Sequence, residues 1–167
     1  MCKSTRVELH LHSPFSNIRL LDAISTIEDS ILTAADMGLK GIAITDHETV
    51  AAHVKAIQKV RELKKIDEET GKSRIPQDFK LTLGNEIYLV NSIEEVQENY
   101  ESGVTKFPHF LLLAKDIEAH EMLRGLSSQA WSQSFYTGAM ERVPTTKAQL
   151  EEAIRSNPNK LIGSSAC

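Results

Sequence analysis

The sequence predicts an α/β protein with a largely parallel sheet. Short apolar segments that are typical of strands alternate with amphipathic segments that are typical of helices, in the order β-α-β-α-β-β-α-α-β. Several of these strands are apolar throughout, as strands buried on both faces are. The chain has 167 residues, enough for one domain with a sizeable core. Since five strands cannot close an eight-stranded barrel, we expect an open sheet or an incomplete barrel.

The amino-terminal part of the chain is expected to form a strand, a helix and a second strand. Residues 6–12 (RVELHLH) alternate strictly between apolar and polar side chains, as a half-buried strand does. Ser25 and Glu28 form the S-x-x-E pattern of a capping box that begins a helix, and Gly38 is placed to end it. Residues 41–45 (GIAIT) then predict a short buried strand.

The middle of the chain is expected to form a helix, a loop and a strand. The helix covers residues 50–65, and its apolar side would carry Val54, Ile57 and Val60. Residues 66–79 are polar and indicate a long loop or a loop insertion. Residues 80–90 contain the third strand, which carries the only glutamate of that apolar stretch.

The last third of the chain is expected to supply two strands and two helices, after a poorly patterned acidic stretch that could hold one further short helix. Ser92 is placed to cap a short acidic helix, and residues 110–114 (FLLLA) predict a strand. Asp116 caps the next helix, and Thr146 begins another with a glutamine three residues later. Residues 161–164 predict the last strand.

The composition excludes several classes of protein. A net charge of −4 with neutral histidines argues against a broad basic surface for nucleic acid, so any contact with DNA would be local or made through a partner. Cys2 and Cys167 give no disulfide framework, which indicates a reducing, cytoplasmic compartment. No apolar run reaches membrane length and no signal segment opens the chain, so no membrane contact is expected.

The first sign of chemistry is the pair of histidines at positions 10 and 12. Two residues apart on a strand, His10 and His12 would point their imidazoles to the same face, where both could bind one divalent ion. Two solvated histidines on an edge strand are the ordinary alternative for an isolated H-x-H pair.

Further candidate ligands lie at or near the ends of the predicted elements. Asp46 and His47 follow a buried strand, at the rim where α/β folds place their chemistry. The carboxylate of Glu86 could bridge two metal ions. Asp22 could fold back over the histidine pair, and Cys167 could offer a thiolate.

The combination of imidazoles, carboxylates and a thiol predicts a cluster of two or three divalent ions. These donors suit zinc, manganese or iron better than magnesium, and such clusters hydrolyse phosphate esters. His109 fits less simply, because it opens a strand and would normally lie at the opposite rim. His53 and His120 are expected to lie at a surface or an interface.

Five segments resemble the polymerase and histidinol phosphatase (PHP) family, and in chain order they are VELHLHSPFS, GLKGIAITDH, LGNEIYLV, HFLLLAKDIEAHEML and LIGSSAC. The fourth is similar to the replicative branch of that family, the DNA polymerase III α subunit. The resemblance implies a distorted (β/α)7 barrel, TIM-like and incomplete in this chain, with residues 1–167 as a single domain that stops before the family's last Asp-x-His metal motif. Residues 66–79 would be a loop insertion.

The resemblance also implies a role for each candidate ligand. His10 and His12 would hold the first ion, Glu86 would bridge to a second, His109 and Cys167 would complete the second, and Asp22 and His47 would belong to a third. The stretch between His12 and Asp22 is longer than is usual in the family.

The implied function is that of a multi-metal phosphoesterase site within a DNA polymerase III α subunit, with a 3′–5′ exonuclease or proofreading role in the full protein. Its partners would be DNA, the rest of the α subunit and replisome components, and the fragment itself could associate with a second copy. Two alternatives remain open. One is a stand-alone phosphoesterase similar to histidinol phosphatase, and the other is a non-catalytic module that metal ions stabilise.

Overall fold

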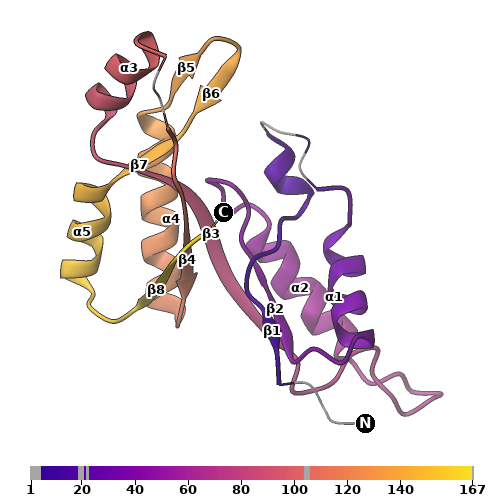
Figure 1. The fold of residues 1–167 in the computed structure, drawn as a ribbon. Helices are drawn as coiled ribbons and strands as arrows, with labels where there is room; N and C mark the ends of the chain where they lie inside the picture. The colour runs from indigo at the N-terminus through magenta and orange to yellow at the C-terminus, as the bar shows by residue number, and fades with distance from the viewer. Residues whose placement is uncertain (1–4, 19–20, 22, 104–105, 167) are drawn as a thin grey trace.

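The computed structural model describes residues 5–18, 21, 23–103 and 106–166. Its main feature is a six-stranded sheet that curls without closing (Figure 1). Five of the strands follow one another in the sheet, and they are β1 (Val7–Glu8), β2 (Gly41–Ile44), β3 (Lys80–Val90), β4 (His109–Ala114) and β8 (Leu161–Ser165). The sixth strand, β7 (Pro144–Thr146), pairs with the far end of β3. The expected α/β fold with an open, barrel-like sheet is thus confirmed.

The sheet is mixed, so the expectation of a largely parallel sheet was wrong in its second half. Strands β1, β2 and β3 are parallel, but β4 is antiparallel to β3 and β8 is antiparallel to β4. The reason is the position of α3 (Ile93–Glu101), which stands at the end of the sheet instead of crossing one of its faces (Figure 1). The chain therefore re-enters the sheet from the end at which it left.

Four helices cover the outer face of the sheet in two pairs. The first pair is α1 (Ile27–Asp36) with α2 (His53–Leu63), and the second is α4 (Ile117–Ser132) with α5 (Lys147–Ser156). Each pair builds its own apolar cluster, one around Ile31 and Ile42 and the other around Leu112 and Leu123. Among the helices of the described residues, none is long and apolar enough to cross a membrane.

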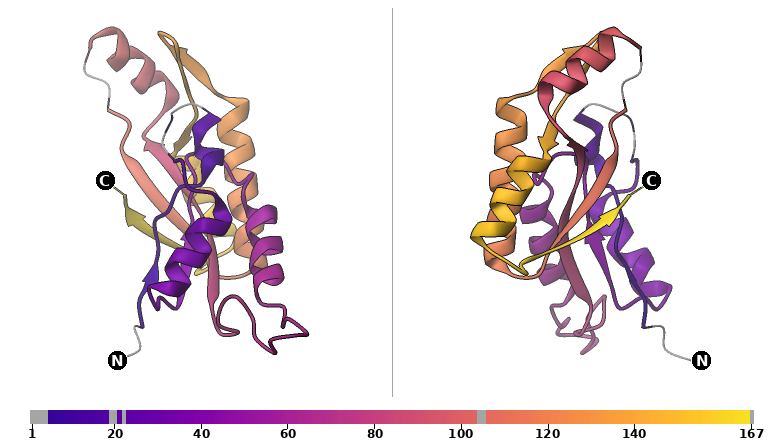
Figure 2. Two further views of the ribbon diagram at one scale, coloured as in Figure 1. Left: turned by 90° about the vertical axis from the view of Figure 1, so that its right-hand side faces the viewer. Right: turned by 60° about the vertical axis from the view of Figure 1, so that its left-hand side comes forward.

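Three short strands were missed by the sequence analysis. Strands β5 (Phe135–Thr137) and β6 (Met140–Arg142) form a hairpin that stands with α3 at the end of the molecule opposite to residues 66–79 (Figures 1 and 2). Like β7, each of these two strands has only three residues. Such segments carry no periodicity from which a strand could be predicted.

The first predicted strand is much shorter than expected. Only Val7 and Glu8 pair with β2, and His10 and His12 lie in an irregular segment beyond them. The pairing between β1 and β2 ends there because hydrogen bonds between Leu11 and Thr45 take the place of further strand pairing. The backbone amide of Leu11 donates to Thr45 Oγ1 at 2.9 Å, and the amide of Thr45 donates to the Leu11 carbonyl at 2.9 Å.

Two details of the first two helices also differ from the prediction. The amino-terminal cap of α1 is Thr26 instead of Ser25, because Thr26 Oγ1 accepts the Asp29 amide at 3.1 Å. On α2 the buried face carries His53, Ala56, Val60 and Leu63. Val54, predicted to face the core, is 64% exposed, because the apolar stripe of the helix begins one residue earlier than expected.

Residues 66–79 contain neither helix nor strand, as predicted, but the loop is anchored at two points. The side chains of Ile75 and Phe79 are buried in the cluster between α1 and α2. The polar loop therefore contributes apolar area to the core.

Gly84 lies where the backbone of β4 leaves no room for a side chain on β3. A Cβ atom at this position would lie 2.6 Å from the Leu112 carbonyl oxygen and 2.7 Å from Leu113 Cδ2. A side chain here would push apart the two strands that meet beside Glu86.

We therefore predict that Gly84→Ala lowers the free energy of unfolding by about 2 kcal/mol, because backbone atoms cannot move aside cheaply. Gly125→Ala is the matched control. Gly125 lies in α4 with no atom near its would-be Cβ. Since alanine favours a helix over glycine, this change should raise stability by about 0.5–1 kcal/mol. Urea unfolding of both variants checks the pair, and an unchanged midpoint for Gly84→Ala would contradict the packing argument.

Candidate metal centre

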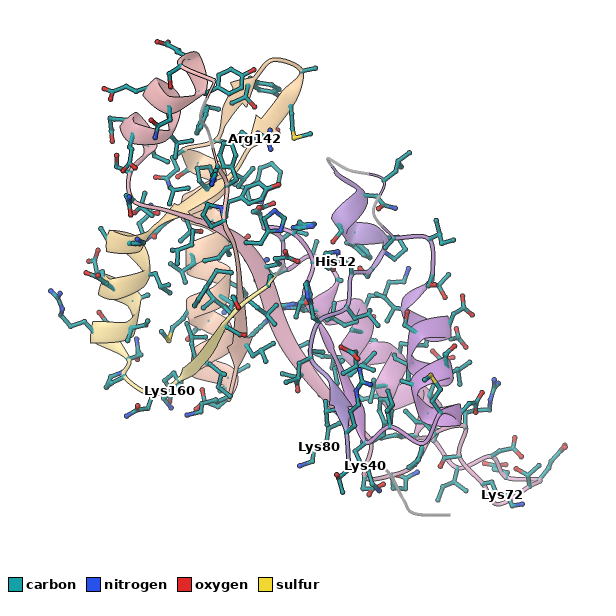
Figure 3. The ribbon with its side chains drawn as sticks, in the orientation of Figure 1. His12, Lys40, Lys72, Lys80, Arg142 and Lys160 are labelled. Atoms are coloured by element: carbon teal, nitrogen blue, oxygen red, sulfur yellow. The ribbon has the colours of Figure 1, made fainter. Side chains whose placement is uncertain are left out.

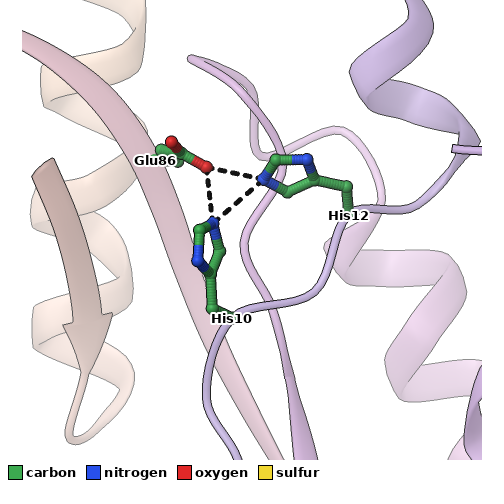
Figure 4. Close-up of side chains that lie close together, drawn as sticks. All are labelled: His10, His12 and Glu86. Atoms are coloured by element: carbon green, nitrogen blue, oxygen red, sulfur yellow. Dashed lines mark hydrogen bonds and ion pairs between the residues drawn. The ribbon is translucent and has the colours of Figure 1, made fainter. Parts of the chain in front are cut away.

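The centre of the site is the carboxylate of Glu86, which is 1% exposed in the middle of β3. The Nε2 atoms of His10 and His12 each lie 2.6 Å from Glu86 Oε2 and 3.2 Å from each other (Figure 4). These three atoms converge on one point, as ligands do around a shared ion. The 3.2 Å between the two nitrogen atoms is close to the separation of about 3.3 Å between donor atoms of a tetrahedral zinc site, whereas the 2.6 Å contacts with Glu86 are those of hydrogen bonds.

A second group of imidazoles, His47 and His109, lies beside the same carboxylate, and the other oxygen of Glu86 faces His109. His109 Nδ1 lies 2.5 Å from Glu86 Oε1, and His47 Nδ1 lies 3.8 Å from Oε2. The ligand atoms of His47, Glu86 and His109 all lie within 4.8 Å of one another. Glu86 therefore belongs to both groups, as a carboxylate that bridges two ions does.

The five side chains come from four separate segments of the chain. His10 and His12 lie after β1, His47 follows β2, Glu86 lies on β3 and His109 opens β4. The structure thus brings together five of the seven residues proposed as ligands from the sequence. The other two, Asp22 and Cys167, lie outside the residues that the structure describes.

His109 reaches the site because β4 runs antiparallel to β3. In that register His109 is the partner of Tyr88, two residues beyond Glu86 on β3. The start of an antiparallel strand lies at the same rim as the ends of its parallel neighbours. The apparent misplacement of this histidine in the sequence therefore has a simple topological cause.

Asp46 acts as a clamp on the loop that carries His12. It is fully buried, and its carboxylate accepts hydrogen bonds from the Ser13 amide at 2.6 Å, from Ser13 Oγ at 2.8 Å and from Ser16 Oγ at 3.0 Å. Burial raises the pKa of Asp46, and the hydrogen bonds from Ser13 and Ser16 oppose that rise. The neighbouring His47 amide donates to Ser16 Oγ at 3.0 Å, so the same loop also holds the backbone of His47.

The backbone after β2 is held equally firmly from the other side. The Asn85 side-chain amide donates to the carbonyls of Asp46 and Thr49, at 2.8 and 3.1 Å. From α4, Ser127 Oγ and Trp131 Nε1 donate to the carbonyl of Glu48, at 3.0 and 2.8 Å. Glu48 has a φ of +48°, and these bonds keep its backbone in that uncommon left-handed conformation.

The surrounding imidazoles keep Glu86 ionised. Burial alone would raise the pKa of this carboxylate, but hydrogen bonds to His12 and His10, the nearby His47 and a hydrogen bond to His109 lower it to about 2. At neutral pH the site therefore offers a negative oxygen pair among imidazole nitrogens. That donor set fits divalent ions of the borderline type.

His53 and His120 form a second, structural pair that the sequence analysis assigned to a surface or interface. His53 is 1% exposed, and its Nε2 atom donates to the Gly84 carbonyl at 2.9 Å. Its Nδ1 atom then accepts a hydrogen bond from His120 Nε2 at 3.0 Å. The signal was present in the sequence, because His53 lies on the same helical face as Ala56, Val60 and Leu63.

Comparisons with known proteins show what the chain is similar to. The family model described as "PHP domain" matches residues 8–167. The chain is 56% identical over 158 residues to "Probable DNA polymerase YorL" of Bacillus subtilis and to a "DNA-directed DNA polymerase" of Bacillus phage SPbeta. These alignments cover 95% of the chain but 12% of each relative.

More distant relatives carry similar names. The chain is 30% identical over 160 residues to the DNA polymerase III subunit alpha of Helicobacter pylori strain J99, covering 95% of the chain and 11% of that protein. Among solved structures, a "putative metal-dependent phosphoesterase" from Bifidobacterium adolescentis superposes with a TM-score of 0.43 at 21% identity, covering 78% of this chain and 36% of the other.

We predict that Asp46→Asn destabilises the protein by about 2–3 kcal/mol, because an amide in place of one carboxylate oxygen leaves buried donors of the Ser13–Ser16 loop without an acceptor. Asp36→Asn is the matched control, since Asp36 is exposed at the end of α1. It should change stability by less than about 0.5 kcal/mol. Thermal and urea unfolding compare the two variants, and equal effects would refute the clamp.

A separate prediction concerns acid sensitivity. Burial lowers the pKa of His53 from its ordinary value to about 4, although the hydrogen bond to Gly84 opposes this. Between pH 6.5 and 4 the unfolded chain binds a proton that folded His53 does not, so stability falls as the pH falls through this window. The loss attributable to His53 is at most about 3 kcal/mol.

In the His53→Gln variant the slope of unfolding free energy against pH should be smaller over this window than in the unmodified chain. Urea unfolding at a series of pH values measures both slopes. Identical slopes would show that His53 does not titrate as its burial requires.

Proposed function

Because the chain belongs to the PHP domain family, we propose that it forms the metal-dependent phosphoesterase region of a replicative DNA polymerase of the DNA polymerase III α type. The observation that carries the proposal is Glu86, whose carboxylate is shared by two groups of imidazoles. The chain spans about one eighth of the length of its Bacillus relatives, 12% in each case. We therefore propose three further properties only for a whole protein of this type. They are polymerisation of DNA, contacts with DNA and with the rest of an α subunit, and a place in the cytoplasm.

His10 and His12 are proposed to hold one divalent ion, and His47 and His109 a second, with Glu86 between them. Asp22 and Cys167 are proposed as further ligands, which would allow a third ion. Zinc, manganese and iron fit these donors better than magnesium. When bound, such ions polarise a phosphate oxygen and lower the pKa of a water molecule.

The residues of the chain supply the position and the charge that phosphodiester hydrolysis needs. Ionised Glu86 supplies a negative oxygen pair for dipositive ions, and the imidazole nitrogens around it supply further donors. Beside the centre, His10 and His12 line an open cleft of about 520 Å³ that Ile24 and Ser30 also border. This cleft gives one nucleotide room to lie next to the reacting phosphate.

The proposed reaction in the full protein is removal of nucleotides from the 3′ end of a DNA strand, as proofreading requires. Residues 1–167 are proposed to act as one PHP unit, with residues 66–79 as a loop insertion at the end of the molecule away from the centre (Figure 1). A single-stranded 3′ end suits the open cleft, because a duplex end is wider than one strand.

The proposal predicts that His10→Ala combined with His12→Ala lowers bound manganese or zinc and slows hydrolysis of bis(p-nitrophenyl) phosphate by about 100-fold or more, given that even outer-shell changes cost 10–100-fold. Elemental analysis after dialysis and a colour assay measure the two effects. His120→Ala is the control, since His120 contacts His53 and lies outside both groups of ligands.

Unchanged metal content in the double variant would contradict the metal centre. Metal-dependent melting of the unmodified chain, without hydrolysis of either the small diester or single-stranded DNA, would instead assign the ions a purely structural role.

A further inference from the structure

A continuous row of contacts leads from the candidate metal centre to an arginine on the β5–β6 hairpin. The ring centroid of Tyr88 lies 4.8 Å from that of His109 and 5.1 Å from that of Phe107. The guanidinium carbon of Arg142 lies 4.4 Å from the centroid of Phe107. Three successive contacts therefore separate Arg142 from a residue of the centre.

The hairpin fixes the orientation of this arginine. Arg142 is the strand partner of Phe135, so it lies on the same face of the hairpin as Thr137, two residues further along β5. Its Nε–H donates to Thr137 Oγ1 at 2.7 Å, and Thr137 itself is buried. One edge of the guanidinium is thus held by the hydroxyl group while its plane faces the Phe107 ring.

Within the part of the chain that the structure describes, no carboxylate forms an ion pair with Arg142, whereas Arg124, for example, pairs with Glu121. Other cations there, such as Arg61 and Arg155, also have no ion pair, so the feature that distinguishes Arg142 is its fixed orientation between Phe107 and Thr137. Its neighbour Glu141 points to the other face of the hairpin, where Ser134 Oγ donates to it at 2.7 Å. The terminal N–H groups of Arg142 are therefore an oriented fork of donors whose charge is not balanced locally.

We propose that Arg142, stacked on Phe107, binds a backbone phosphate of a single-stranded nucleic acid whose reacting phosphodiester lies at the metal centre. The guanidinium fork matches two phosphate oxygens, and the exposed part of an aromatic ring can add stacking on a base. Because the chain carries a net charge of −4, an anionic strand needs such a local cation. This inference rests on the proposed phosphodiesterase function and adds a second point of attachment for its substrate.

The placement of the hairpin supports a strand as the ligand. Figure 3 shows Arg142 on the hairpin and His12 on the loop of the other half of the molecule. The row of rings along Tyr88 and Phe107 connects the two positions. A strand that enters the centre from this side passes the arginine, whereas a lone phosphate ion could not contact both.

The test is the binding of fluorescein-labelled oligothymidylate of about ten nucleotides, a typical site size for single strands, followed by fluorescence anisotropy in EDTA. Without divalent ions no metal-dependent hydrolysis occurs, so the result does not depend on the catalytic role of the centre. A failure of the proposed function would appear separately, as absence of metal-dependent hydrolysis by the unmodified chain.

We expect Arg142→Met to weaken binding about tenfold, which is the effect of one charge-assisted contact. The slope of log affinity against log salt concentration should become shallower by about 0.7, the value for one phosphate contact on a single strand. Arg124→Met is the matched control, since Arg124 is an exposed arginine on α4 that pairs with Glu121. Unchanged binding by Arg142→Met, or equal losses in both variants, would overturn the proposal.

Two further measurements cover folding and the source of the phosphate. Thr137→Val removes the hydroxyl group that orients Arg142 but keeps every charge, so it should weaken binding severalfold and leave the salt slope unchanged. If Arg142→Met fails to fold, the binding of Thr137→Val tests the proposal instead. Unchanged binding by a folded Thr137→Val would overturn it. If the unmodified chain bound thymidine monophosphate as tightly as the oligomer, the ligand of Arg142 would be a free phosphate group. That result would overturn the proposal that a nucleic-acid strand binds there.

Discussion

The burial of one carboxylate among four imidazoles is the constraint on which the rest of the structure depends. An ionised glutamate cannot be removed from water unless cations or hydrogen-bond donors compensate its charge. Glu86 is 1% exposed, and nitrogen atoms of His10, His12 and His109 lie within 2.6 Å of its two oxygens. These contacts come from segments far apart in the chain, so the fold has to hold several loops in fixed positions around the middle of β3.

Those positions are held by polar side chains that are not themselves candidate ligands. Asp46 ties the Ser13–Ser16 loop to the end of β2, and Asn85 holds the next turn by two backbone carbonyls. Behind the sheet, the imidazole of His53 binds the carbonyl of Gly84, two residues from Glu86. Since buried hydrogen bonds are costly to leave unmade, these residues make the arrangement of the centre rigid before any ion binds. Contacts between the rings of Tyr88 and Phe107, and between Phe107 and Arg142, connect the centre with the β5–β6 hairpin.

Several features of the fold could be predicted because their causes are local. The helix caps at Ser92, Asp116 and Thr146 depend on hydrogen bonds within one turn, and the structure contains all three. The failures have non-local causes. β1 is short because Thr45, distant in sequence, replaces its ladder, and β4 is antiparallel because α3 stands at the end of the sheet. His53 was missed although its place on the apolar face of α2 could have been read from the spacing of Ala56, Val60 and Leu63.

The sequence by itself determined which residues could do chemistry and roughly where the elements begin and end, because residue type, capping and periodicity act over a few positions. It pointed to His10, His12, His47, Glu86 and His109 as a set, since all lie at or near strands or their ends. Only the tertiary structure decided that the four imidazoles share the carboxylate of Glu86, and that Arg142 lies three contacts away from His109. Distances between residues so far apart in the chain depend on strand direction and register, and these follow from packing over the whole sheet.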